Sequence, residues 1–193
     1  MSSMSTVREK LIDATFNEVF TAGYSAASLA NILKRADVKK GAMYHYFPSK
    51  KDMVLAMIDE KLEQRTKNKW EPIINEDGNL IDILISILQD TKSFNLIEGC
   101  PLGNLLQEHL DEDEDFSNIL TSILNKWKEI FVSILEKAKQ KNQINQTTNT
   151  LQCATFLIAS IEGAILLSKK SHDNQDFEDC MIQLVNYINT LRR

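Results

Sequence analysis

The sequence predicts an all-α protein of about nine helices. Apolar residues recur at intervals of three and four along most of the chain, and the alternation typical of strands is absent. Only six Gly and three Pro occur among 193 residues, so few positions can break a helix. With 43% hydrophobic and 25% charged residues, the composition is that of a globular protein with a substantial core.

The first helix is predicted to begin after Thr6, because Thr6 and Glu9 have the spacing of a capping box. Its apolar face includes Leu11 and Val19, and Gly23 can take the left-handed conformation that ends a helix. We expect this helix to be the scaffold for the helices that follow.

Residues 28–50 predict a helix-turn-helix, the pair of short helices that reads DNA in the major groove. Ser28 can cap the first of these helices, and residues 36–38 supply the turn before the second. Pro48 ends the second helix, and Ser49 can cap a fourth helix that continues to about Lys69.

The residues expected to contact DNA combine cations, small side chains and aromatic rings. Lysines would bind phosphates or guanine edges, and small residues would allow close approach to the bases. The alternative is that the aromatic residues are core and the lysines a solvated face; we adopt it for Phe47 and not for Tyr44. The predicted contacts are Ser28, Lys39, Lys40, Gly41, Ala42, Tyr44, His45 and Lys50.

The charge distribution supports a nucleic-acid-binding N-terminal part. Residues 1–70 contain 12 Lys and Arg against 8 Asp and Glu, whereas residues 71–193 contain 10 against 19. Lys51 adds to the lysines at the two predicted helix starts.

The first third of the chain resembles the TetR/AcrR family of bacterial transcriptional repressors. The resemblance is carried by Ala22-Gly23-Tyr24, Ser28-Leu29-Ala30-x-Ile32-Leu33, Ala36-Asp37-Val38, Lys40-Gly41-Ala42, Tyr44-His45-Tyr46-Phe47 and Ser49-Lys50. It implies a helix-turn-helix domain over residues 1–52 and a ligand-binding and dimerisation domain over residues 53–193. Two positions depart from the pattern: Asn31, where the family often has an acidic residue and which we interpret as a surface change, and Ala42, where Thr is common.

Beyond Pro72 the helical pattern restarts, with helices predicted over 79–94, from Pro101 to 109, and over 116–141, 147–169 and 176–191. Residues 99–105, GCPLGNL, resemble a motif in the regulatory domain of the LmrA/YxaF-like branch of the family, which implies a small-molecule inducer. A pocket between such helices would be apolar with a few polar groups. The candidate ligand residues are Phe94, Cys100, Asn104, Glu108, Trp127, Phe131, Phe156 and Glu162.

The last two helices have broad apolar faces that one chain cannot cover, so we expect a homodimer through a four-helix interface. The longest apolar run, Cys153–Leu167, is interpreted as too short to span a bilayer. With three widely spaced cysteines and no export signal, we expect a cytoplasmic protein that does not associate with membranes.

No spacing typical of catalytic or metal-binding motifs is found, so we expect no enzyme activity, no cofactor and no metal. The acidic run at residues 111–115 is interpreted as a solvated loop. The predicted function is a repressor that binds a palindromic operator on double-stranded DNA as a dimer and is released by an inducer. The alternative is a redox or electrophile sensor that acts through Cys100, whose place before a helix start can lower a thiol pKa.

Overall fold

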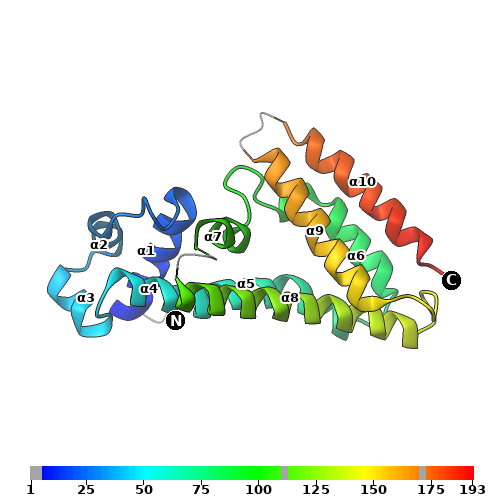
Figure 1. Ribbon diagram of the computed structural model, residues 1–193, viewed down its shortest axis with the longest axis horizontal. Helices are drawn as coiled ribbons and strands as arrows, with labels where there is room; N and C mark the ends of the chain where they lie inside the picture. The colour runs from blue at the N-terminus through cyan, green and yellow to red at the C-terminus, as the bar shows by residue number, and fades with distance from the viewer. Residues whose placement is uncertain (1–5, 110–112, 170–172) are drawn as a thin grey trace, which may run out of the picture. The chain divides into compact units, whose positions relative to one another are not determined.

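A computed structural model of the chain describes residues 6–109, 113–169 and 173–193. The described residues form two compact units, one built from the N-terminus to Gln64 together with Asn104–Ile123, the other from Arg65–Gly103 and Leu124–Arg193. Figure 1 shows the helices in order: α1 (Val7–Ala22), α2 (Leu29–Ala36), α3 (Lys40–Tyr46), α4 (Lys50–Met57), α5 (Glu63–Trp70), α6 (Leu80–Gln89), α7 (Pro101–His109), α8 (Glu114–Gln140), α9 (Thr150–Ser168) and α10 (Gln175–Thr190).

Helices α4 and α5 are joined by a π-helical segment, Ile58–Leu62, into one continuous run. Counted that way, the described residues contain the nine helices that the sequence predicts. The predicted fourth helix to about Lys69 is therefore confirmed, but its pattern did not reveal the π segment. Short 3-10 helices cover Glu71–Asn75 and Thr91–Ser93.

Helix α1 is the scaffold of the first unit. The predicted capping box forms: the Glu9 amide donates to the Thr6 hydroxyl, and the Thr6 amide donates to the Glu9 carboxylate at 2.7 Å. Gly23 ends the helix at φ +81°. Buried side chains on α1, including Leu11 and Ile12, face α2 and α4.

A buried carboxylate ties α1 to the start of α2. Glu18 is 7% exposed, and its Oε1 accepts hydrogen bonds from the Ser28 amide at 3.2 Å and from Asn31 Nδ2 at 2.8 Å. Asn31 is thus part of this link, and the interpretation of Asn31 as an inconsequential surface change is wrong. An acidic residue at position 31 would face Glu18 with the same charge.

The first unit extends past residue 52, the boundary suggested by the sequence. Met53, Val54 and Met57 of α4 are all at most 1% exposed, and α4 packs on α1. The second part of α7, from Asn104, and the first part of α8, to Ile123, also belong to this unit.

The second unit is a bundle in which α10 packs on both α9 and α6 (Figure 1). Its C-terminal end is fastened by the Asn145 amide, which donates to Leu191 O at 2.8 Å, and by an ion pair between Arg192 and Asp82. The only bridge of β type among the described residues joins Ile144 and Arg192.

Replacing Glu18 with Leu is expected to lower the free energy of unfolding by about 1–3 kcal/mol, because the Ser28 amide and the Asn31 side chain lose a charged acceptor. Glu18→Gln keeps an oxygen at this position and should cost less than about 1 kcal/mol. Urea unfolding followed by circular dichroism measures both; equal losses in the two variants would mean that the hydrogen bonds do not matter.

Candidate nucleic-acid interface and ligand site

The helix-turn-helix is built by local capping and a left-handed turn. Ser28 Oγ accepts from the Asn31 amide at the start of α2, as the sequence predicts. Asp37 lies at φ +53°, a conformation that Asp tolerates better than most residues, and Val38 N donates back to Leu33 O at 3.1 Å. This turn places α3 directly after α2.

Helix α3 buries a single side chain, that of Met43, which is 0% exposed. The other residues of the helix are exposed, including the predicted contacts Lys40, Gly41 and Ala42, and Lys39 is exposed just before it. A helix that keeps one side chain inside can present the rest to a partner.

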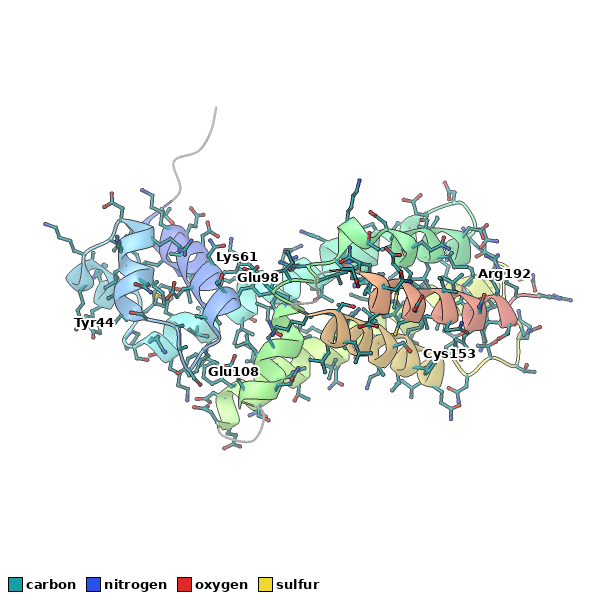
Figure 2. All side chains as sticks on the ribbon, turned by 90° about the horizontal axis from the view of Figure 1, so that it is seen from above. Tyr44, Lys61, Glu98, Glu108, Cys153 and Arg192 are labelled. Atoms are coloured by element: carbon teal, nitrogen blue, oxygen red, sulfur yellow. The ribbon has the colours of Figure 1, made fainter. Side chains whose placement is uncertain are left out.

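The aromatic residues after Met43 divide as expected. Tyr44 is 49% exposed and projects from α3 (Figure 2), with Lys40 Nζ 5.8 Å from its ring centre. Phe47 is 4% exposed and belongs to the core. His45 is exposed and its ring packs edge-on against Tyr46.

Two of the four lysines considered from the sequence have partners inside the protein. Lys50 Nζ donates to Tyr24 O at 2.8 Å and Ala27 O at 3.0 Å, which leaves one of its three N–H bonds for a phosphate. Lys51 Nζ lies 2.8 Å from Asp113 and 2.6 Å from Asp115. The hydrogen bonds that Lys51 donates to these two carboxylates raise the pKa of Lys51.

The acidic run therefore has a specific contact in its described part, Asp113–Asp115, while residues 111 and 112 lie outside the described residues.

Lys34 and Arg35 in the last turn of α2 are exposed cations that sequence reasoning did not assign. Their position just before the turn was the available signal. Exposed cations thus lie at both ends of the turn, and Arg35 also lies 4.0 Å from the Glu18 carboxylate.

In the second unit, three predicted ligand residues meet in an aromatic cluster. Trp127, Phe131 and Phe94 all lie near Trp70, with ring centres 6.4, 4.9 and 6.3 Å away. Phe177 extends the cluster, 4.8 Å from Phe94. Sequence reasoning missed Trp70 and Phe177, because spacing within one helix does not say which helices face each other.

Lys69 lies at the edge of this aromatic cluster. Its Nζ is 3.3 Å from the Phe94 ring centre and 5.0 Å from that of Trp70, and it donates to Ser93 O at 2.6 Å. Burial, with a smaller contribution from Arg65, lowers the pKa of Lys69 to about 8. The aromatic rings stabilise the charged form of Lys69, whereas the loss of water around the amine destabilises it.

A buried thiol and a buried carboxyl group form a second polar site in this unit. Burial raises the pKa of Cys100 and also that of Glu162, and the two groups share a hydrogen bond. Gly103 allows this arrangement, since a Cβ at that position would overlap the Glu162 carboxyl group. Glu162 Oε1 and the indole N–H of Trp127 are buried without a hydrogen-bond partner.

Three predicted ligand residues do not join these sites. Asn104 and Glu108 belong to the first unit, where Glu108 accepts a hydrogen bond from the Ser25 amide at 3.2 Å. Phe156 is 47% exposed and packs edge-on against Tyr187, so it lies on an outer face. Periodicity identified apolar faces but not what covers them.

That outer face is a broad apolar surface on α9 and α10. Helix α9 is by length and composition long and apolar enough to cross a membrane, contrary to the sequence interpretation, yet 44% of its most apolar window is buried inside the protein. Around Ala159 and Gly163 the helix is open: a Cβ at Gly163 would meet nothing within 4 Å. The large apolar side chains exposed on this surface are Leu151, Phe156, Leu166, Leu167 and Ile182.

In the described parts of the chain, no three His, Cys, Asp or Glu side chains gather as metal ligands would.

Comparison with known proteins places both units in one family. The tetR family of bacterial regulatory proteins matches residues 11–57, and the tetracyclin repressor-like C-terminal domain matches residues 79–184. An uncharacterised HTH-type transcriptional regulator in the lacX 3' region of Lactococcus lactis is 31% identical over 175 residues, which cover 89% of this chain and 87% of that protein. The transcriptional repressor NemR of Escherichia coli K12 is 26% identical over 187 residues, 95% of this chain and 94% of NemR.

Solved structures share the fold over nearly the whole chain. A TetR family regulator from Cytophaga hutchinsonii superposes with a TM-score of 0.86 at 21% identity, covering 99% of this chain and 98% of that one. The reduced form of E. coli NemR gives a TM-score of 0.81 at 26% identity, covering 93% and 95%. Because the matched regions include the whole helix-turn-helix and most of the second unit, the chain belongs to the TetR family of bacterial transcriptional regulators and is not an enzyme.

Proposed function

We propose that this protein is a repressor that binds a palindromic operator as a homodimer and is released by a small-molecule inducer. The observation that carries the proposal is α3, whose cations, small residues and Tyr44 are exposed while Met43 alone is buried. That is the arrangement needed to enter a major groove. The name of the relative NemR, a transcriptional repressor, supports repression over activation. Because its target is DNA, we place the protein in the cytoplasm.

The exposed face of α9 and α10 supports the dimer. Small residues at 159 and 163 let a second helix approach closely, and the exposed leucines and Phe156 would be removed from water. A dimer through this face would have two-fold symmetry, so the two copies of α3 would read half-sites that are inverted repeats of each other.

Two of the buried polar groups that lack a partner in the second unit, the Trp127 indole N–H and Glu162 Oε1, suggest the chemistry of the inducer. A buried indole N–H without an acceptor costs about 1–3 kcal/mol, which a ligand acceptor would recover. Glu162 would take a hydrogen-bond donor or a cationic group. We therefore expect an apolar, ring-containing inducer with a few polar atoms. If it binds better to the state that cannot bind DNA, operator occupancy falls by linkage.

Gly41 offers a test of the DNA interface. In vitro selection from random duplexes should yield a palindromic site. Gly41→Ala should then weaken binding to that site roughly tenfold or more, because the added methyl lies where a base edge approaches. The fold should not suffer, since a Cβ at Gly41 meets nothing within 4 Å and Ala favours helices by about 0.5–1 kcal/mol. Fluorescence anisotropy and thermal unfolding measure the two effects; unchanged affinity would exclude close approach at this position.

Gly163 offers the matching test of the dimer. Gly163→Leu adds a side chain at another position that is open in the protomer, so it should disrupt the dimer and leave each chain folded. Sedimentation should show the wild type at twice the protomer mass of 22.0 kDa and the variant shifted toward that mass. Gly41→Ala serves as the control that stays dimeric. A monomeric wild type at micromolar concentration would contradict the palindromic operator as well.

The thiol-sensing alternative makes a different prediction at Cys100. Burial raises its pKa, so little thiolate exists at neutral pH and attack on electrophiles is slow. Iodoacetamide at pH 7.5, followed by mass spectrometry, should therefore modify Cys100 much more slowly than it modifies free cysteine. Faster modification of Cys100 would favour the sensor.

A further inference from the structure

The turn between α1 and α2, residues 23–27, is held by charged side chains from two other helices. It leads directly into Ser28, the cap of α2. Lys50 of α4 donates hydrogen bonds to two carbonyl groups of the turn, while Glu108 of α7 accepts one from the Ser25 amide at 3.2 Å. The Lys50 ammonium group therefore binds backbone acceptors of the turn, and the Glu108 carboxylate binds a backbone donor. The charge on each side chain makes these hydrogen bonds stronger.

Gly23 lets the Glu108 carboxylate come close. At this position φ is +81°, and a Cβ would lie 2.5 Å from Glu108 Oε1. The glycine thus has two roles, since it ends α1 and leaves room for a carboxylate against the backbone. The neighbouring Tyr24 ring packs edge-on against Phe116 of α8, with the two ring centres 4.8 Å apart. Lys50 Nζ lies over the Tyr24 ring, 4.4 Å from its centre.

Helix α7 is shared between the two units. Its first residues, Pro101–Gly103, belong to the second unit, and Asn104–His109 belong to the first. Within the second unit, Gly103 lies against Glu162, and within the first, Glu108 holds the α1–α2 turn (Figure 2). Glu108 therefore joins the second part of α7 to the turn that leads into α2.

We propose that Glu108 is a positioning residue for operator binding: its hydrogen bond to the Ser25 amide fixes the turn that sets the direction of α2 and α3. Glu108 itself does not contact DNA. The inference rests on the proposed function, because it assumes that α3 reads an operator.

The experiment compares Glu108→Met, which keeps the length of the side chain without an acceptor, with Glu108→Gln, which keeps an oxygen for the Ser25 amide. Amide hydrogen exchange at Ser25 reports the bond in the absence of DNA, and anisotropy at several salt concentrations reports operator binding. Glu114→Ala, which removes an exposed carboxylate from the first turn of α8, is the control for charge alone.

For Glu108→Met we expect faster exchange at Ser25 and operator affinity lowered roughly tenfold. The slope of log K against log salt should stay unchanged, because no phosphate contact is lost. Glu108→Gln should stay close to the wild type in both measurements, and Glu114→Ala should leave Ser25 exchange unchanged. Lys40→Ala, by contrast, should reduce the slope by about one per subunit.

Wild-type affinity in Glu108→Met would overturn the inference, and so would an altered salt slope or an equal effect of Glu108→Gln. Should the Met variant fail to fold, Glu108→Ala is measured in the same way and judged by the same outcomes. A wild-type protein that selects no duplex would instead reject the proposed function, and exchange at Ser25 would still report whether Glu108 holds the turn.

Discussion

The burial of Met43 is the contact on which the reading surface depends. Helix α3 has seven residues, too few to be stable in water by itself, so its conformation must come from the rest of the unit. Inside the helix only Met43 supplies that contact, and Phe47 adds a second just beyond its end. Because Met43 is the one residue of α3 that is buried, the other side chains of the helix are exposed and available for the proposed contact with DNA. The cost is that the neighbouring turns must be held firmly, which Glu18 and Glu108 do.

Features set by neighbours in sequence could be predicted from the sequence. The capping box at Thr6, the side-chain caps at Ser28 and Ser49 and the stop at Gly23 all form as their spacing indicates. Each depends on residues three or four positions apart, and the physical chemistry of such short segments varies little between proteins. The same holds for the order of the helices and for the exposure of Tyr44 against the burial of Phe47.

Features set by partners that are distant in sequence could not be predicted in this way. Lys51 is one of the lysines clustered at the predicted helix starts, but the fold pairs it with Asp113 and Asp115, more than 60 residues away along the chain. Glu108 looked like a pocket residue because it lies on an apolar helix, yet it binds the backbone 83 positions earlier. A charge pattern gives the number of cations on a helix but not which of them are already paired. The aromatic candidates for a ligand site were chosen by residue type, and only the fold separates Trp127, which stacks on Trp70, from Phe156, which packs against Tyr187.

The aromatic cluster has a practical consequence for spectroscopy. The chain contains two tryptophans, Trp70 and Trp127, and both lie in the second unit with their rings 6.4 Å apart. Intrinsic tryptophan emission is therefore a signal from that unit alone, while the helix-turn-helix is represented only by tyrosines. With Lys69 beside Trp70, the emission should also respond to the charge of an amine that titrates near pH 8. The protein thus carries its own optical probe of the regulatory unit, which can be read during DNA binding without attaching a dye.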